Sequence, residues 1–200
     1  SWDRNRDGLS PVTDLRFVFG QDFAGLGGQS KYIKTMAQVT AETKVLREEV
    51  TLRGQLEGGA LSMLGGQSST ATDRYFLNGK MIGFNPNGVG PRDLTAVGQD
   101  ALGGTMYAVA KLESEFPLGF PAEYGINGGV FLNAGSVWGL SDTAGTAGAV
   151  DDKFHLRATT GVSIFWNTAI GPLRFDFAKP LIKESYDRPM FFNFTIASKF

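Results

Sequence analysis

The chain has 200 residues and a mass of 21.5 kDa, which favours a single domain. Its 19 basic and 20 acidic residues nearly cancel, which argues against a nucleic-acid-binding face, and the absence of cysteine excludes a disulfide framework or a thiolate site. No segment fits a transmembrane helix, because the longest uncharged stretch, 124–141, is rich in glycine. The mean hydropathy of -0.09 suits a soluble β protein or a membrane β-barrel with alternating strands, and composition leaves both open.

A two-residue periodicity dominates the chain. Between positions 31 and 45, the face that carries Ile33 and Val39 has no charge, whereas the opposite face carries Lys34, Glu42 and Lys44. The same alternation recurs along the sequence and predicts eight strands, at roughly 12–22, 31–46, 49–64, 104–118, 124–139, 156–167, 172–180 and 190–200. Many of these segments reach ten residues or more, which suits a tilted crossing of a bilayer.

Successive side chains of a strand point to opposite faces, so each predicted strand has an apolar side and a polar side. The polar side carries charges on nearly every strand, and the apolar side mixes large residues with many Gly, Ala and Thr. We interpret the polar side as an ion-paired lumen and the apolar side as a lipid-facing surface. Val39, Leu56 and Val130 should then face outward, with Glu57 and Glu113 inside. The alternative is a soluble sandwich or lipocalin-like barrel, whose apolar side would form the dry interior.

The predicted connectors alternate in length. Short turns at 46–48 and 119–123 contrast with a loop at 65–103, and outer-membrane barrels likewise have short periplasmic turns and longer outer loops. Such a loop would be unusual in a compact soluble domain. The sequence therefore predicts an all-β fold, an antiparallel transmembrane β-barrel of eight strands, forming one domain over 1–200. We expect it in the bacterial outer membrane, with periplasmic termini and loop 65–103 extracellular.

Candidate polar sites are few. His155, the single histidine, lies near Asp151, so a Ser-His-Asp lipid hydrolase is conceivable, but a solvated histidine at a loop edge is the favoured interpretation. Glu113 and Glu115 share a face with Lys111, which is typical of a structural charge network rather than of acid-base catalysis. No metal-ligand spacing occurs, and we predict no cofactor and no metal.

Aromatic residues mark the expected membrane boundaries. In this topology Trp138 lies near the outer surface of the membrane and Trp166 near the periplasmic surface, as in the aromatic girdles of membrane barrels, although ordinary packing would also explain them. An apolar stripe forms the lipid-facing side of the last predicted strand: Phe192, Phe194, Ile196 and Phe200.

Several stretches, taken in order along the chain, resemble the C-terminal barrel region of the Omp85 family. They are 102–110, 112–118, 129–138, 156–161, 166–176 and 192–200, preceded by 74–79 and 81–84 inside the long loop. The resemblance implies a membrane barrel of a protein that inserts and folds outer-membrane proteins by offering strand edges at a seam beside a thinned bilayer. It also implies that the terminal apolar stripe acts as a β-signal, the element that assembly machinery recognises.

The loop motif departs from the family pattern. It reads Met81, Ile82, Gly83 and Phe84, and the resemblance implies an arginine where Ile82 stands. In the family that arginine reaches into the lumen and pairs with two acids, whose positions correspond here to Glu113 and Asn133. Losing one partner of a buried ion pair costs about 3–5 kcal/mol, whereas replacing both partners is often nearly neutral. The joint loss of the cation and of one acid therefore indicates a coordinated change.

The family barrel has sixteen strands and follows periplasmic POTRA domains, whereas this sequence contains eight predicted strands and no POTRA segment. Eight strands close into a barrel whose interior side chains just fill. We therefore expect strand 12–22 to pair with strand 190–200, and loop 65–103 to lie outside the lumen. A ring of sixteen strands built from two chains is the alternative.

The predicted function is thus that of a barrel segment from an assembly insertase, with little assembly activity alone. Two alternatives stay open: a structural or engineered small membrane barrel that keeps the fold without the function, and a barrel-embedded lipid enzyme that rests on His155. The expected partners are outer-membrane lipid or detergent, other subunits of the assembly machinery and nascent outer-membrane proteins, but no nucleic acid. We do not expect an enzyme.

Overall fold

The computed structural model describes residues 13–25, 31–46, 49–140, 143, 150–169 and 171–196. Its main sheet contains eight strands, and every neighbouring pair is antiparallel. In spatial order they are β1 Thr13–Ala24, β2 Tyr32–Val45, β3 Val50–Met63, β5 Met106–Pro117, β6 Ile126–Trp138, β8 Arg157–Thr168, β9 Gly171–Ile182 and β10 Phe192–Ile196. The all-β, antiparallel class expected from the alternation is confirmed.

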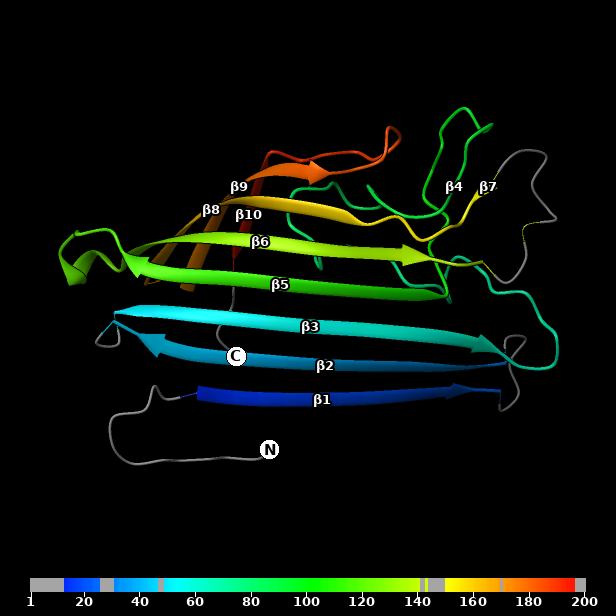
Figure 1. Ribbon diagram of the computed structural model, residues 1–200, viewed down its shortest axis with the longest axis horizontal. Coiled ribbons are helices and arrows are strands. Elements are labelled where there is room, and N and C mark those ends of the chain that lie inside the picture. The colour runs from blue at the N-terminus through cyan, green and yellow to red at the C-terminus, as the bar shows by residue number, and fades with distance from the viewer. Residues whose placement is uncertain are drawn as a thin grey trace.

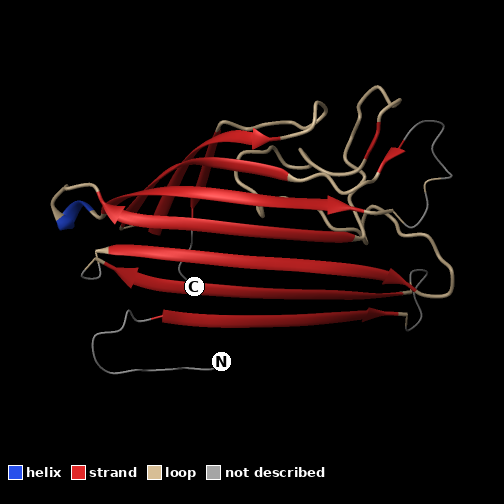
Figure 2. Ribbon diagram, viewed as in Figure 1, coloured by secondary structure: helices blue, strands red, loops and turns tan. Residues whose placement is uncertain are grey.

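Three short elements lie outside this sheet. The strands β4 (Arg92–Asp93) and β7 (Val150–Asp151) pair with each other at the end of the sheet that carries the long loops, and the 3₁₀-helix η1 (Ala122–Tyr124) lies at the opposite end (Figure 2). None of them was predicted from the sequence, because elements of two or three residues are too short to show a periodicity. In the described part of the chain, no helix has the length and apolar character needed to cross a membrane.

The main sheet curls over one of its faces but is open (Figure 1). Among the described residues, β1 pairs with β2 alone and β10 pairs with β9 alone. The expected pairing of strand 12–22 with strand 190–200 is therefore not observed. The reason is steric. The concave face of the sheet holds a folded loop, whereas the interior of a closed eight-stranded barrel has space for side chains only.

The alternation of side chains correctly predicts which face of the sheet is outer and apolar and which is inner and polar. Val39, Leu56 and Val130 lie on the outer face and are 37 %, 60 % and 48 % exposed, whereas Glu57 is buried on the inner face at 6 % exposed. Many other large apolar side chains are exposed on the outer face, among them Leu15, Phe17, Phe19, Leu112, Leu132 and Val162. A soluble sandwich would bury this face in a dry core, so the arrangement contradicts that alternative and fits a surface bathed by lipid.

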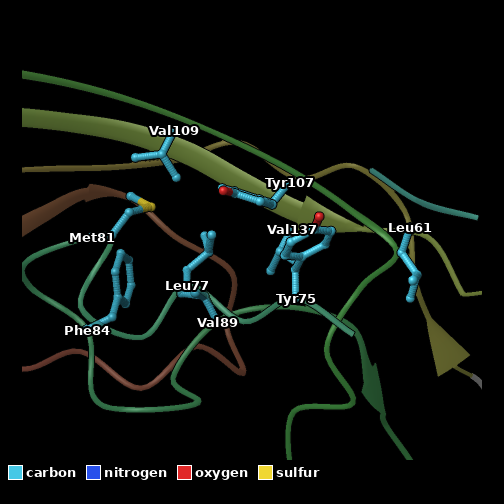
Figure 3. Packing of buried hydrophobic residues seen from close by; sticks show 9 residues of the cluster. All are labelled: Leu61, Tyr75, Leu77, Met81, Phe84, Val89, Tyr107, Val109 and Val137. Carbon is cyan, nitrogen blue, oxygen red and sulfur yellow. The ribbon is translucent and has the colours of Figure 1, made fainter. Parts of the chain in front are cut away.

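The long loop after β3 folds back against the concave, inner face of the sheet. Its side chains Tyr75, Leu77, Met81, Phe84 and Val89 form a buried cluster with residues of the strands (Figure 3). The strand members of the cluster are Leu61, Tyr107, Val109 and Val137. The expectation that loop 65–103 lies outside the lumen is thus wrong. The premise that the loop cannot fit inside a closed eight-stranded barrel agrees with the structure, but the sheet stays open and the loop occupies its inside.

Candidate functional site

The inner face carries a network of ion pairs centred on Glu113 of β5. The Arg53 guanidinium on β3 contacts it at 3.2 Å and also contacts Glu42 of β2 at 2.8 Å. Arg174 of β9 contacts Glu113 at 2.6 Å and Asp176 at 2.7 Å. The strand register brings these groups together, because Arg53 is the direct partner of Glu42 and of Glu113 on its two neighbours. The inner face therefore carries ion pairs, as expected of the polar side, and two strand arginines neutralise Glu113.

The loop motif lies against the wall formed by β8 and β9. Met81 and Phe84 are buried in the cluster beneath the sheet. The carbonyl of Ile82 accepts a hydrogen bond of 2.7 Å from the Thr159 hydroxyl of β8. Gly83 has a φ of +101°, and a Cβ built there would lie 2.9 Å from Thr159 Cγ2. The backbone of the motif can approach the strand this closely because Gly83 has no side chain.

A cavity of about 480 Å³ opens between the motif and the charged wall. Its lining includes Ile82, Glu113 and Asn133, so the structure brings together the three positions that the sequence grouped. Asn133 is 2 % exposed, and its Nδ2 forms no hydrogen bond within the described residues. Ile82 supplies no charge here, and the cations that compensate Glu113 come from the strands instead of the loop.

A contact between the tilted rings of two tyrosines, Tyr75 of the loop and Tyr107 of β5, attaches the start of the loop to the sheet. The rings of Tyr75 and Tyr107 have centroids 4.6 Å apart, and the Tyr75 hydroxyl donates to the Thr35 carbonyl at 2.8 Å. A Cβ at Gly59, the register partner of Tyr107, would come within 2.6 Å of the Tyr107 ring and 2.8 Å of the Tyr75 ring. Burial, assisted by the nearby Tyr107, raises the pKa of Tyr75 to about 12. Tyr75 therefore stays a neutral donor at physiological pH.

A second polar cluster joins loop residues at the end of the sheet that carries the long loops. Arg157 and Asp187, both almost fully buried, form an ion pair at 3.0 Å, and the Tyr186 hydroxyl donates to Asp151 at 3.0 Å. Burial alone would raise the pKa of the Asp151 carboxyl, but hydrogen bonds with His155 and Tyr186 outweigh it and hold this pKa below its ordinary value. Burial, reinforced by the bond to Asp151, raises the pKa of Tyr186.

His155 belongs to this cluster. Its Nε2 lies 2.9 Å from Asp151 and its Nδ1 lies 3.2 Å from Glu184, so carboxylates occupy both ring nitrogens. A triad would need one of these nitrogens to face a nucleophilic hydroxyl. In the described part of the chain His155 forms no hydrogen bond to a serine or threonine side chain. The geometry favours a structural role for His155 and gives the hydrolase alternative no support.

The remaining predicted residues lie on the outer face or at its ends. Trp138 and Trp166 lie at opposite ends of the sheet, since Trp138 pairs with Met106 at the start of β5 while Trp166 pairs with Ile126 at the start of β6. Phe192, Phe194 and Ile196 are exposed on β10. Phe200 lies outside the described residues.

Comparison with known proteins relates this geometry to a family. A model of the Omp85 superfamily domain matches residues 1–200. The chain belongs to the Omp85 superfamily. The outer membrane protein assembly factor BamA of Neorickettsia risticii is 31 % identical over 182 residues, which are 91 % of this chain and 24 % of that protein. The Sorting and assembly machinery component 50 homolog of Mus musculus is 29 % identical over 163 residues, or 78 % of this chain and 32 % of that protein.

A solved Omp85 structure shares the fold. BamA from Haemophilus ducreyi lacking POTRA domains 1–3 superposes with a TM-score of 0.77 at 20 % identity, covering 96 % of this chain and 40 % of that one. The chain therefore spans well under half of the relatives that it matches. The transmembrane β-barrel class predicted from the sequence is confirmed by this shared fold, although the sheet is open among the described residues.

The residues that fasten the long loop, above all Lys80 and Tyr75, were not identified from the sequence, nor was the pair of Arg157 with Asp187, which joins β8 to the loop after β9. One signal could have indicated the tyrosine contact, because Gly59 occupies an inward position opposite the large Tyr107. Lys80 gives no such signal, since a single lysine before an apolar motif in a loop resembles any solvated lysine.

Proposed function

We propose that this chain forms part of the barrel of a BamA-type outer-membrane protein assembly factor in a bacterial outer membrane. The observation that carries the proposal is the match to the Omp85 superfamily domain over residues 1–200. It is supported by a sheet with an apolar outer face and a charged inner face that holds a packed loop. Relatives named as assembly factors span both bacteria and animals.

The proposed topology puts the short-turn end of the sheet in the periplasm and the long loops at the outer surface. Few residues separate β2 from β3 and β8 from β9, and at the same end β1 starts and β10 finishes. Apart from β10, the strands of the main sheet have 12 to 14 residues, which is sufficient to cross about 30 Å of hydrocarbon at a tilt. Trp138 and Trp166 would then lie at opposite membrane interfaces.

In this proposal the site residues have distinct roles. The segment Met81–Phe84 and the wall around Glu113 and Asn133 hold the loop inside the barrel. The apolar stripe on β10, with Phe192 and Phe194 exposed beside the rings of β9, serves as the β-signal. The partners are outer-membrane lipid, other subunits of the assembly machinery and nascent outer-membrane proteins. We also propose that residues 1–200 alone have little assembly activity.

A reconstitution experiment tests the proposal. The full-length protein, with the other assembly subunits, is placed in lipid vesicles, and folding of a urea-denatured outer-membrane barrel protein is followed by its heat-modifiable gel mobility. We expect folding to be faster than in protein-free vesicles, and residues 1–200 alone to add little. Equal rates with and without the full-length protein would contradict the proposed function and favour a purely structural barrel. Full activity from residues 1–200 would contradict the low activity proposed for this segment.

A further inference from the structure

We propose that Lys80 is the positioning residue that anchors the long loop to the inner wall, through an ion pair with Glu57 of β3, and that assembly activity requires the loop held in this position. The second part rests on the proposed function, whereas the first part concerns the contact itself. Nothing in the sequence motif Met81–Phe84 supplies a charge to this wall, so the residue just before the motif takes on particular importance.

The contact is well defined. Lys80 Nζ lies 2.5 Å from Glu57 Oε1, and it also lies 4.9 Å from the centroid of the Tyr107 ring on β5. Gln55 donates to the other oxygen of Glu57 at 2.7 Å. Lys80 therefore makes two attractive contacts, a charge-assisted hydrogen bond to a carboxylate and a cation–π contact with an aromatic face. The lysine head is thus held by two neighbouring strands, β3 and β5.

Burial makes the ion pair of Lys80 with Glu57 important for keeping the loop docked. The Glu57 side chain is almost completely removed from solvent, and Lys80 is about one-quarter exposed. A buried carboxylate needs a nearby cation, and an ion pair that is held by further hydrogen bonds resists exchange with water. Lys80 provides that cation from the loop, so release of the loop from the wall would remove the cation in direct contact with the carboxylate.

The position of Lys80 also suits an anchor. The chain continues directly into Met81, which packs in the buried cluster, and into Ile82, whose carbonyl is bonded to Thr159 of β8. The lysine therefore fastens one side of this segment to β3 while Thr159 fastens the other side to the opposite wall. Two attachments on distant strands fix both the location and the orientation of the segment.

Lys111 makes the proposal testable without loss of the fold. It lies on the inner face of β5 opposite Gln55, and it interacts electrostatically with Glu57. If Lys80 loses its charge, Lys111 still partly compensates the carboxylate of Glu57. A Lys80→Met variant should therefore keep the sheet and release the loop.

Chymotrypsin cleavage of the folded full-length protein measures that release, because the target residues Tyr75, Leu77 and Phe84 are buried only while the loop is docked. Cleavage tracks the population of the open form when opening is rapid. Removing a charged hydrogen-bond partner should make cleavage of Lys80→Met about tenfold faster. Lys80→Arg should restore protection, because a guanidinium can still pair with Glu57. Lys153→Met, which alters an exposed lysine, is the matched control and should leave cleavage unchanged.

A double-mutant cycle tests whether the effect passes through Glu57. Glu57→Gln and the double variant should each be cleaved at about the rate of Lys80→Met, since two changes to one contact are not additive. Unchanged cleavage in Lys80→Met, failure of Lys80→Arg to protect, or multiplicative effects in the double variant would each overturn the anchor. Heat-modifiable mobility reports that each variant is folded, and Glu57→Gln alone tests the contact from the sheet side.

The requirement of the docked loop for assembly activity is tested in the vesicle assay, which measures the rate of client folding. We expect Lys80→Met to slow client folding and Lys80→Arg to restore it. Normal client folding with a released loop would overturn the requirement for the anchored loop while leaving the anchor intact. A wild-type protein that protects its loop but assembles nothing would refute the proposed function alone.

Discussion

Replacing Gly83 by alanine should undock the loop by a steric effect that the structure allows to be isolated. Gly83 has a φ of +101°, and an added Cβ would lie 2.9 Å from Thr159 Cγ2 and 3.1 Å from Ala178 Cβ. The strained backbone costs about 1–3 kcal/mol. Overpacking against the wall adds about 1–3 kcal/mol, because β8 and β9 are fixed by their own ladder.

Gly79→Ala is the matched control. Gly79 also has a positive φ, +70°, but a Cβ there would have no neighbour within 4 Å. This variant therefore experiences backbone strain of about 1–2 kcal/mol without the clash. The difference between the two variants reports the contact between Gly83 and the wall.

Hydrogen exchange measured by mass spectrometry over peptides that span 77–84 provides the assay, since local opening sets the exchange rate. We expect Gly83→Ala to accelerate exchange about 10- to 100-fold more than Gly79→Ala, because 1.4 kcal/mol corresponds to a factor of ten. Exchange in β3, whose backbone is held by its ladders to β2 and β5, should not change. Equal acceleration in the two variants would refute the close packing of Gly83 against β8 and β9.

Three other predictions concern the lipid face, the buried pair and the loop cluster. Leu56→Arg places a charge on the outer face of β3 and should lower the free energy of unfolding in vesicles by about 2–4 kcal/mol, measured by urea titration; an unchanged free energy of unfolding would contradict lipid contact. Arg157→Met should cost about 3–5 kcal/mol in the same titration, since it isolates the Asp187 carboxylate, and an unaltered midpoint would refute the buried pair. Because the pKa of Asp151 is lowered, the loop contacts that it makes should persist above the ordinary aspartate pKa and fail only as pH falls through the lowered one. A carboxyl NMR titration checks this, and Tyr186→Phe should raise that pKa.

Part of the fold follows from local pattern. The charges at Lys34 and Glu42 against Ile33 and Val39 predict a strand with one polar and one apolar side, and β2 has this form: Val39 lies exposed on the outer face and Glu42 pairs with Arg53 on the inner face. The candidate site could be predicted only in part. Ile82, Glu113 and Asn133 do line one cavity, but the cations that serve Glu113 are Arg53 and Arg174. The sequence alone places both arginines on the inner face, but the acid with which each one pairs depends on how the strands are arranged in space.

The sequence by itself determined the period of the strands, the direction of each side chain and the overall class, because alternation at a spacing of two is a property of adjacent residues. Only the tertiary structure decided that the sheet stays open, that the long loop lies inside it and that Lys80 meets Glu57. Those outcomes depend on contacts between residues far apart in the chain, such as Ile82 and Thr159, which are 77 positions apart. No local pattern encodes such a contact, since it forms only where the curvature of the sheet leaves room for the loop.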